Sequence, residues 1–276
     1  MSKISTVPTK KPISVKHLAN FGDVVAAMCG LKSVSESLGR KIDFYQWLDV
    51  QAQYYQGAVH PVLNDEGVMV CMNRKVFEMA KPLVESQDYI NSFTEWRGEK
   101  VQVDLDIIRN KLFVNMPNGA IQTWLMLAYP DMAADISKPW IKVKPSPKYK
   151  NKIILNFTER YRNTMISYFF LKEYQADCVF TGTEKEHEKF CSMWGITIPR
   201  IEINDFLELA QYIKGCRFFM GNQSSAWNLA IAMGKPSILE MCQFAPNCQP
   251  FVGTDNLGFY HQDALNHYFE YLSQKY

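Results

Sequence analysis

The sequence contains no apolar run of the roughly 18 or more residues that a membrane-spanning helix requires. Its polar start carries Lys3, Lys10 and Lys11, and no apolar signal segment follows it. The formal net charge is only +2, and no cluster of lysine and arginine is long enough to form a nucleic-acid-binding arm. These absences predict a cytoplasmic protein without an integral membrane segment.

Motifs for metal binding and for activated nucleophiles are also missing. None of the seven cysteines belongs to a CxxC pair, and their odd number argues against a disulfide framework. There is no HExxH, GxSxG or GxxxxGKS/T motif. Asp104-Leu105-Asp106 has the spelling of a DxD motif, but on a strand its two acidic side chains would share one face and have a structural role. We therefore expect buried, reduced thiols, no cofactor and no required metal.

What the sequence does contain is an alternation of expected strands and helices. In the first half, a strand over 13–17, a turn over 18–23 and a helix from Val24 lead to a strand over 42–48. Such β-turn-α-β units predict parallel sheets. The alternation is most regular in the second half, with expected strands at 153–157, 178–180, 200–203, 216–220 and 237–241 and expected helices at 164–174, 184–194, 206–214 and 224–233.

A proline- and lysine-rich segment separates the two halves. Residues 137–150, SKPWIKVKPSPKYK, contain three prolines and five lysines and have little hydrophobic periodicity. This composition is typical of a linker. We therefore predict an α/β protein of two Rossmann-like domains that face a cleft, with an N-terminal domain over 1–137, a linker over 138–150 and a C-terminal domain over 151–276.

The segment Gly221-Asn222-Gln223-Ser224-Ser225 connects an expected strand to an expected amphipathic helix. Gly221 permits a sharp turn, and Ser224 or Ser225 is a suitable N-cap. The first N–H groups of a helix have no internal partner and, together with the helix dipole, attract anions. Ligands of doubly wound sheets bind where strands end and helices begin, so this segment, with Asn222 and Gln223, is a candidate phosphate or carboxylate site. A serine-capped helix without a ligand is the alternative.

Two further strand ends in the second half carry polar residues. Thr158, Arg160 and Arg162 follow the first of these strands. They suit diphosphate recognition, because arginine offers a rigid fork of donors and threonine a hydroxyl, although a solvated loop is the alternative. Gly182 and Thr183 follow the next strand, where Thr183 could instead cap a helix. These residues are the candidate donor-binding set of the second half.

Acidic and basic candidates lie at two other strand ends. Asp23, after Gly22, could take a proton from an acceptor hydroxyl, although an N-cap role is equally common. His17 is a second candidate base with a structural role as its alternative, and Asn20 lies in the same turn. Glu240, near the last strand end, could accept hydrogen bonds from a ribose. We assign His17, Asn20 and Gly22 to the acceptor side and Glu240 to the donor side.

Two segments carry a resemblance to a known family. ISVKHLANFGDVVAAMCGLKSV resembles the start of the bacterial heptosyltransferases, glycosyltransferase family 9, in which a strand, a Gly-Asp turn and a helix of small apolar residues follow one another. LELAQYIKGCRFFMGNQSSAWNLAIAMGKPSIL resembles the C-terminal signature of the same family. NFTERYRN and GNQSSAWNLAIAMGKP together are similar to proteins described as glycosyltransferase-like. The resemblance covers both ends of both halves.

The resemblance implies a GT-B fold, a nucleotide-sugar donor and metal-independent, inverting transfer. Asp23 matches the family's proposed catalytic base, Thr158 and Arg160 match its first donor-phosphate loop, and residues 222–225 match its diphosphate turn. Within that turn the acidic residue of the family is an amide here, and Asn228 replaces the histidine that follows. The chain is also shorter than typical members, which implies a trimmed acceptor domain.

The leading hypothesis is therefore a glycosyltransferase that moves a sugar from a nucleotide-sugar co-substrate to an acceptor hydroxyl. The acceptor stays open among a glycan, a protein, a small molecule and a nucleic-acid base. A nucleotide or nucleotide-sugar binding protein without transfer activity is the second hypothesis, and the altered turn favours it. A sugar-nucleotide epimerase is the third, and the missing carboxylate and histidine pairs at matched strand ends count against it.

Overall fold

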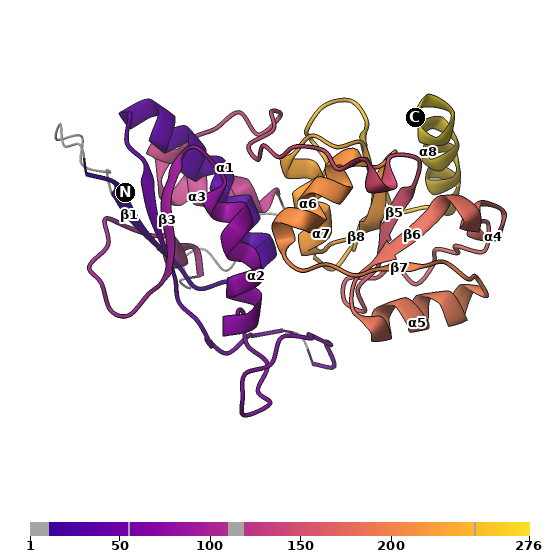
Figure 1. The fold of residues 1–276 in the computed structure, drawn as a ribbon, viewed down its shortest axis with the longest axis horizontal. Helices are drawn as coiled ribbons and strands as arrows, with labels where there is room; N and C mark the ends of the chain where they lie inside the picture. Colours follow the sequence, from indigo (N-terminus) through magenta and orange to yellow (C-terminus); the bar gives the residue numbers. More distant parts are fainter. Residues whose placement is uncertain (1–10, 55, 110–118, 246) are drawn as a thin grey trace. The chain divides into compact units, whose positions relative to one another are not determined.

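The computed structural model describes residues 11–54, 56–109, 119–245 and 247–276 (Figure 1). The chain divides into two compact units, which are treated separately below. Unit 1 comprises the residues up to 136 together with 205–207, and unit 2 comprises 137–204 and 208–276. Each unit is built on a parallel β-sheet with helices packed against it, which confirms the predicted α/β class with two Rossmann-like sheets.

The unit 1 sheet has the strand order β3-β2-β1-β4, with every pair parallel. The first strand, β1, thus lies between β2 and β4. The elements of this unit are β1 (Ile13–His17), α1 (Phe21–Leu38), β2 (Ile42–Gln46), α2 (Arg74–Glu85), β3 (Ile90–Glu95), β4 (Val103–Asp104), the 3-10 helix η1 (Leu105–Arg109), α3 (Ile121–Ala128) and the 3-10 helix η2 (Pro130–Met132).

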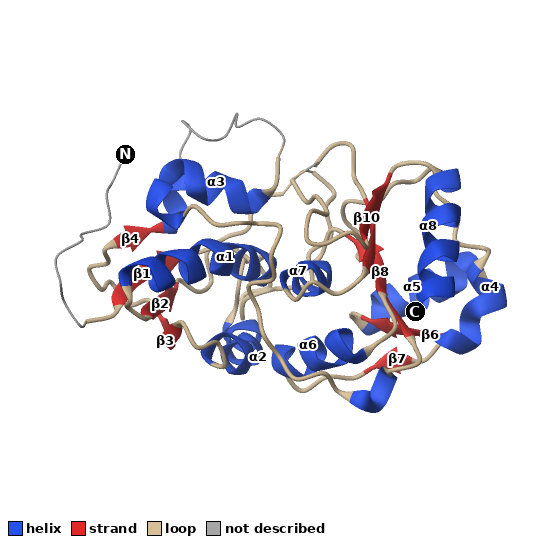
Figure 2. Ribbon diagram, turned by 90° about the horizontal axis from the view of Figure 1, so that it is seen from above, coloured by secondary structure: helices blue, strands red, loops and turns tan. Residues whose placement is uncertain are grey.

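Alternating burial divides the unit 1 sheet into two different faces. Ile13, Val15 and Phe44 are fully buried, and Phe44 contacts Phe93, which packs against Phe77 of α2. Helices α1 and α2 lie on one side of this sheet (Figure 2). The intervening residues, such as Lys16 and Tyr45, are only half-buried. Parallel sheets are usually covered by apolar packing on both faces, so the polar second face of this sheet is a departure from the Rossmann pattern.

The unit 2 sheet has the order β10-β9-β8-β5-β6-β7, again with every pair parallel. Its first strand, β5, lies in the middle, with β6 and β7 on one side and β8, β9 and β10 on the other, which is the doubly wound order. The elements of this unit are η3 (Pro147–Tyr149), β5 (Ile153–Asn156), α4 (Leu171–Tyr174), η4 (Gln175–Asp177), β6 (Cys178–Thr181), α5 (Glu184–Trp194), β7 (Arg200–Ile201), α6 (Phe206–Gly215), β8 (Phe219–Asn222), α7 (Ser225–Ala232), β9 (Ser237–Glu240), β10 (Asn256–Phe259) and α8 (Gln262–Lys275).

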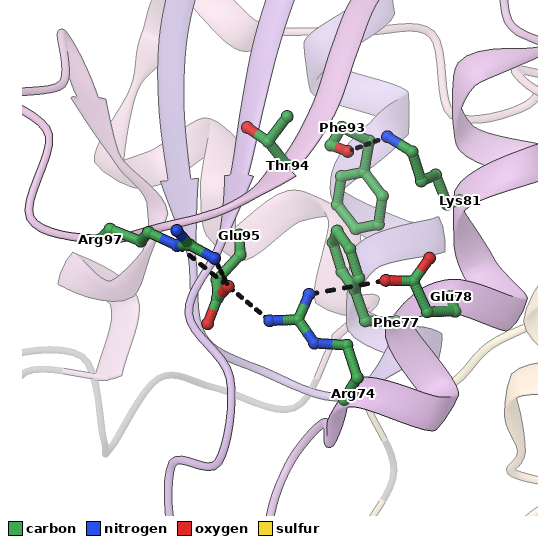
Figure 3. A pocket seen from close by; sticks show the side chains of 8 residues that line it. All are labelled: Arg74, Phe77, Glu78, Lys81, Phe93, Thr94, Glu95 and Arg97. Atoms are coloured by element: carbon green, nitrogen blue, oxygen red, sulfur yellow. Dashed lines mark hydrogen bonds and ion pairs between the residues drawn. The ribbon is translucent and has the colours of Figure 1, made fainter.

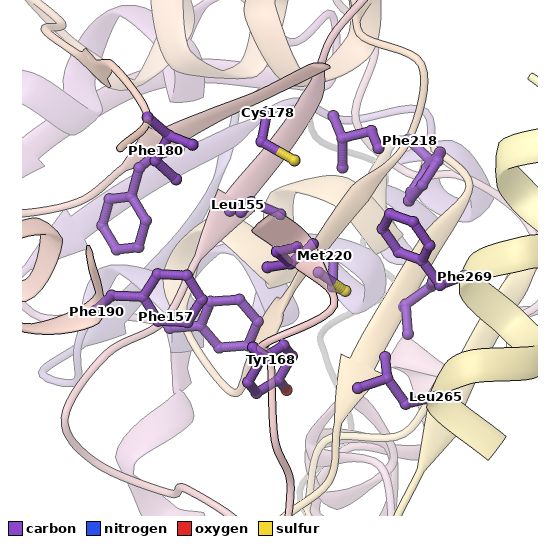
Figure 4. Packing of buried hydrophobic residues seen from close by; sticks show 14 of the residues in the cluster. Leu155, Phe157, Tyr168, Cys178, Phe180, Phe190, Phe218, Met220, Leu265 and Phe269 are labelled. Atoms are coloured by element: carbon purple, nitrogen blue, oxygen red, sulfur yellow. The ribbon is translucent and has the colours of Figure 1, made fainter. Parts of the chain in front are cut away.

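Aromatic side chains form much of the unit 2 core (Figure 4). Phe157 and Phe190 stack with ring centroids 4.6 Å apart and an angle of 4° between the rings, and Tyr168 packs against both. Fully burying a side chain of this size contributes about 1.5–3 kcal/mol. The core thus fixes Phe157, the residue at which β5 gives way to the loop that follows it.

The segment predicted as a linker is packed against unit 2. The backbone N–H groups of Trp140 and Ile141 both donate to Ala232 O, at 2.9 and 3.1 Å, and Ser146 N donates to Gln211 O at 2.9 Å. The side chains of Trp140 and Ile141 are buried. Residues 138–150 therefore belong to the body of unit 2 and are not a free spacer.

Two strands and one helix differ from the sequence-based expectation. Strands β3 and β10 were not expected, and both lie at a sheet edge, where a strand has one neighbour and tolerates polar residues and glycine. The helix expected over 164–174 is wrong for most of its length, because only Leu171–Tyr174 is helical. Ser167 exchanges two hydrogen bonds with the Gln262 side chain, at 2.8 and 3.1 Å, and this pairing holds the segment outside a helix.

Candidate functional site

The strand order marks one position in each sheet where a ligand is expected. In a doubly wound sheet, ligands bind outside the carboxyl ends of the two neighbouring strands from which the chain runs off in opposite directions. In unit 2 these strands are β5 and β8. The loop 157–163 follows β5, and the turn 221–225 ends β8 and begins α7. The two strongest donor-site candidates of the sequence therefore lie side by side.

Backbone contact at this position requires glycine. A Cβ added to Gly221 would lie 2.2 Å from Asn156 O on the neighbouring strand, so no other residue fits without moving the backbone. Gly182, at the end of β6, has a φ of +147°, and an added Cβ would lie 2.9 Å from a ring carbon of Phe180. Both glycines thus have a steric role in the edge of the sheet.

Asn222 joins the loop to the turn. Its side chain is fully buried, and its Oδ1 accepts a hydrogen bond from Thr158 N at 2.9 Å. Its Nδ2 donates to Arg160 O at 2.5 Å. Asn222 thus anchors the backbone of loop 157–163, and its contact with a ligand stays a prediction.

Arg162 and Glu240 bind each other. Arg162 Nε lies 2.9 Å from Glu240 Oε1, and its second contact to Oε2 is 3.2 Å. Glu240 is fully buried and also accepts from Asn163 N at 2.5 Å and from Tyr168 Oη at 2.6 Å. Burial and the nearby Glu240 carboxylate raise the pKa of Tyr168 well above its usual value. The sequence-based roles in diphosphate and ribose binding did not anticipate this pair, which fixes the end of the loop.

The beginning of α7 is capped and tethered to a second loop. Ser224 is the N-cap, and its Oγ accepts from Trp227 N at 3.2 Å. Gln223, which is buried, donates to Ala245 O at 2.6 Å and accepts from Cys242 N at 3.3 Å. Ser225 is the first helical residue and is half-buried. The turn therefore presents the first amides of α7 on a support fixed on both sides.

Several further polar groups lie at the carboxyl edge of the unit 2 sheet. Thr158 and Arg160 are half-buried in the loop, and the Arg160 guanidinium lies 5.5 Å from the ring centroid of Tyr161. Tyr161 has a φ of +54°, a conformation that non-glycine residues adopt at a cost of roughly 1–3 kcal/mol. Asn156, missed as a candidate although it lies in the same motif, is 5% exposed, and no described residue hydrogen-bonds its Oδ1. A buried acceptor of this kind calls for an explanation, and a bound ligand supplies one.

Thr183 has the capping role that the sequence left open. Its Oγ1 accepts from Glu186 N at 3.2 Å, and the Glu186 carboxylate accepts from Thr183 N at 2.9 Å, which completes a capping box for α5. Glu159 of the loop 157–163 pairs with Lys185 and Lys189 of the same helix. The hydrogen bond from Lys189 lowers the pKa of Glu159. Helix α5 thus supports the loop from the side of β6.

In unit 1, the predicted turn before α1 is partly helical. Asn20 is the N-cap, Val24 N donates to Asn20 O at 3.0 Å, and Gly22 and Asp23 lie in the first turn. The prediction of a turn through Asp23 is therefore wrong, because Asn20 and not Asp23 takes the cap position. Asp23 is half-buried, and Asn20 Nδ2 lies 3.4 Å from its Oδ2. A carboxylate in the first turn complements the helix dipole.

His17 and Asn20 have partners within unit 1. His17 is buried, and its Nδ1 lies 3.2 Å from Gln46 Oε1. The Asn20 Oδ1 accepts from Tyr54 Oη at 3.1 Å. His17 therefore has the surroundings of a satisfied core histidine, and Asn20 both caps α1 and contacts a neighbouring loop.

Asp106 is the residue that the sequence-based selection missed. Strand β4 ends at Asp104 and Asp106 lies in η1, so the two side chains do not share a strand face as predicted. Asp106 Oδ1 accepts from Leu18 N at 2.9 Å, directly after β1. Burial, and then the Asp104 carboxylate, raise the pKa of Asp106 to about 7, against the opposing effect of Lys16. The available signal was the DxD spelling of residues 104–106, for which the sequence predicted a structural role.

A shallow hollow of about 250 Å³ lies between α2 and β3 in unit 1 (Figure 3). Glu95 pairs there with both Arg74 and Arg97, and these two arginines lower its pKa. Arg74 also lies 3.5 Å from Glu78. The charges of the hollow compensate one another, and no motif in the sequence pointed to it.

Neither a metal cluster nor a membrane span occurs in the part of the chain that the structure describes. Within those residues, no three histidine, cysteine, aspartate or glutamate side chains gather as metal ligands. Their helices are too short or too polar to cross a bilayer.

The fold is similar to that of solved glycosyltransferases. No family model matches the sequence, and no curated protein is significantly similar to it. The E. coli heptosyltransferase WaaC, solved with ADP, superposes with a TM-score of 0.61 over 95% of this chain and 99% of its own, at 10% identity. A glycosyl transferase family 9 protein from Veillonella parvula gives 0.55 over 98% and 91%, also at 10% identity. The E. coli ADP-heptose heptosyltransferase II gives 0.52 over 96% and 99%, at 11% identity. At this identity the likeness is one of fold.

Proposed function

We propose that this protein is a glycosyltransferase in which unit 2 binds a nucleotide-sugar donor and Asp23 of unit 1 activates an acceptor hydroxyl. The observation that carries the proposal is the meeting of loop 157–163, the glycine-built turn 221–225 and the start of α7 at the β5–β8 position of the sheet. The full-length likeness to heptosyltransferases, one of them bound to ADP, supports the same ligand class.

The unit 2 residues divide into two groups under this proposal. The amides at the start of α7, together with Thr158 and Arg160, contact the donor diphosphate, because they combine N–H donors, a hydroxyl and a positive charge at one strand end. Asn156 adds a buried acceptor with no described partner. The anchors Asn222, Gln223, Arg162 and Glu240 act through the backbone that they hold.

The reaction is a single displacement. The acceptor oxygen attacks the anomeric carbon while Asp23 takes its proton, the bond from that carbon to the diphosphate breaks, and the electron pair leaves with the diphosphate. One attack from the opposite face inverts the configuration at the anomeric carbon. Arg160 and the dipole of α7 stabilise the charge that develops on the diphosphate, so the transfer requires no metal and no cofactor. The acceptor contributes a hydroxyl and is not otherwise specified.

A thermal-shift screen with nucleoside diphosphates and their sugars tests donor binding. A ligand that binds only the folded protein stabilises it by about 2.7 kcal/mol at a hundredfold excess over its Kd. We expect one nucleotide class to raise the Tm, and Arg160→Ala to reduce that shift. Arg97→Ala removes the same charge from a side chain of unit 1 that is 75% exposed and is the matched control, with an unchanged shift. No shift with any nucleotide contradicts the proposal.

Donor binding without transfer is the second candidate function. The turn carries Asn222 and Gln223, and both amides are engaged as anchors, so the turn itself offers no acidic side chain. Assaying transfer and donor hydrolysis in the wild type and in Asp23→Asn separates the two. Donor affinity that survives in both proteins, with turnover only in the wild type, supports transfer by Asp23. Donor affinity with no turnover in either supports a binding protein.

The protonation state of the buried cysteine thiols is relevant to the cellular location of the protein. Burial raises the pKa of Cys29 and Cys178 to about 12 and that of Cys216 to about 11, which keeps these groups protonated and unreactive. Protected thiols of this kind support the proposal of a reducing, cytoplasmic location.

A further inference from the structure

Unit 1 has a sheet position equivalent to the donor position of unit 2. The order β3-β2-β1-β4 places β1 beside β4, just as β5 lies beside β8 in the other sheet. The chain leaves β1 through Leu18 and reaches Asp23 in the first turn of α1. It leaves β4 into η1, which carries Asp106.

One hydrogen bond joins the two segments at this position. Asp106 Oδ1 accepts from Leu18 N at 2.9 Å, across 88 residues of sequence. Unit 2 contains the corresponding contact, in which Asn222 Oδ1 accepts from Thr158 N, also at 2.9 Å. In both sheets a side chain at the end of the fourth strand therefore fixes the backbone just after the first.

The two anchoring side chains, Asp106 and Asn222, differ in that only Asp106 can carry a charge. The buried surroundings of Asp106 make its ionised form energetically costly. Its side chain is 10% exposed, and no described residue hydrogen-bonds its Oδ2, which lies 3.4 Å from Lys16 Nζ. Lys16 lies closer to Asp104, at 2.9 Å, so two carboxyl groups share one ammonium group. Tyr129 also faces this cluster, and its Oη donates to Asp104 O at 2.9 Å.

A neutral side chain would make the same contact to the backbone. Asn222 does so in unit 2 without a charge, so the fold itself does not require a carboxyl group at position 106. A carboxyl group, unlike an amide, can gain and lose a proton. An ionised oxygen accepts a hydrogen bond more strongly than a protonated one. The strength of the bond to Leu18 N therefore changes with the protonation of Asp106.

We propose that Asp106 is a positioning residue for the segment Leu18–Asp23, which it holds through the Leu18 N–H more firmly when its carboxyl group is ionised. The inference rests on the proposed function, in which Asp23 accepts the proton of the acceptor hydroxyl. Asp106 itself touches no substrate in this scheme. The proposal predicts that kcat rises as Asp106 loses its proton, while the affinity of unit 2 for the donor does not change.

Two substitutions separate the hydrogen bond from the charge. Asp106→Asn keeps an oxygen that can accept from Leu18 N, as Asn222 does for Thr158 N, but does not titrate. Asp106→Ala removes the acceptor as well. We expect Asp106→Ala to lower kcat about tenfold at pH 8, where the wild-type carboxyl group is ionised, which corresponds to one hydrogen bond to a charged group, and to lower it by less at pH 6. We expect Asp106→Asn to retain more of kcat than Asp106→Ala and to lose the wild-type rise in kcat around neutral pH.

The Leu18 backbone amide gives a readout that does not depend on activity. In ¹⁵N-labelled wild-type protein, its resonance should titrate with a midpoint near 7, the pKa of Asp106. The titration should be absent in Asp106→Asn. It should move to lower pH in Asp104→Asn, because the Asp104 carboxylate contributes to the raised pKa of Asp106. The 46% exposed side chain of Asp104 makes this a mild substitution.

The outcomes distinguish the inference from the function on which it rests. A Leu18 amide that does not titrate near neutral pH, or a kcat profile unchanged in Asp106→Asn, overturns the role of Asp106 even where transfer is observed. A Leu18 amide that titrates as expected, in a protein that transfers no sugar, supports the positioning contact and contradicts the proposed function. Equal kcat in Asp106→Ala and the wild type also overturns the positioning role.

Discussion

The two sheets fix the segment after their first strand by the same contact but surround it with different charges. In unit 2 the Asn222 amide is neutral, and the nearby charges of Arg162 and Glu240 neutralise each other in a pair. In unit 1 the Asp106 carboxyl group shares Lys16 with Asp104. The first arrangement anchors the backbone through a neutral amide, which is compatible with the anion binding proposed for unit 2. The second contains a carboxyl group whose pKa is raised to about 7, which is compatible with the proton transfer proposed for the segment that it holds.

The largest expected effect is the loss of stability when a side chain is added at Gly221, where β5 and β8 approach each other closely. Gly221→Ala places a Cβ 2.2 Å from Asn156 O, so β5 and β8 must separate. We expect a loss of more than about 3 kcal/mol in the free energy of unfolding, because the clash is with backbone. Urea denaturation measures it. Gly253→Ala is the control, since its φ is +69° with nothing within 4 Å, and it should lose only about 1 kcal/mol. Equal losses in the two variants would show that the close approach of the strands is not what demands glycine.

Giving Asn222 of unit 2 the residue type of Asp106 in unit 1 tests whether the charge of the anchoring side chain distinguishes the two sheets. Asn222→Asp buries a carboxylate whose second oxygen faces Arg160 O, where Nδ2 now donates at 2.5 Å. We expect the free energy of unfolding at pH 8 to fall by about 3 kcal/mol. The loss should shrink at low pH, because a protonated carboxyl group can donate to Arg160 O. Guanidinium denaturation at several pH values measures it, and a loss independent of pH would contradict this account.

The buried ion pair of unit 2 should matter more than the exposed pairs on the same loop. Glu240→Gln leaves Arg162 without its carboxylate in a site where Glu240 is fully buried, and we expect a loss of about 3 kcal/mol. Glu159→Gln is the matched control, because its partners Lys185 and Lys189 are 74% and 53% exposed. It should lose less than about 1 kcal/mol. Thermal denaturation of the two variants side by side decides the point, and comparable losses would count against a special role for burial.

The smallest effect is the pH dependence that Asp106 gives to stability. The folded pKa of about 7 lies above the ordinary aspartate pKa of 3.8, so the stability that this group contributes is complete below about pH 3.8 and is lost as the pH rises to about 7. Asp106→Asn removes this loss. We expect the variant to match the wild type near pH 4 and to be the more stable protein at pH 8. Urea denaturation from pH 4 to 8 measures the difference, and a constant difference across this range would contradict the raised pKa.

The features that the sequence predicted are the ones encoded locally. The central strands, the cap at Thr183 and the turn 221–225 each follow from residues within a few positions of one another, and the structure contains them. The edge strands β3 and β10 carry polar residues or glycine and give a weak local signal. Helix α1 begins at Phe21, with Asn20 at the N-cap position but without a capping hydrogen bond from its side chain, so no local capping signal marked this start.

The anchors of the site could not be predicted, because each joins residues far apart in the sequence. Thr158 and Asn222 are 64 residues apart, Arg162 and Glu240 are 78 apart, and Leu18 and Asp106 are 88 apart. A sequence pattern shows that a residue lies at a strand end, but not which other strand end meets it. The sequence therefore placed the candidate residues at strand ends, while the identity of those that anchor a distant backbone segment needed the structure.

The hydrogen bonds of Gln223 offer a way to monitor ligand binding at the proposed donor site. Gln223 holds Cys242 N and Ala245 O, on either side of Phe244, whose side chain is 87% exposed. The exposed Phe244 ring therefore lies in a loop that Gln223 connects to the turn before α7. A tryptophan placed at position 244 would be a fluorescent reporter on the turn, with an emission that shifts when a ligand settles at the start of α7.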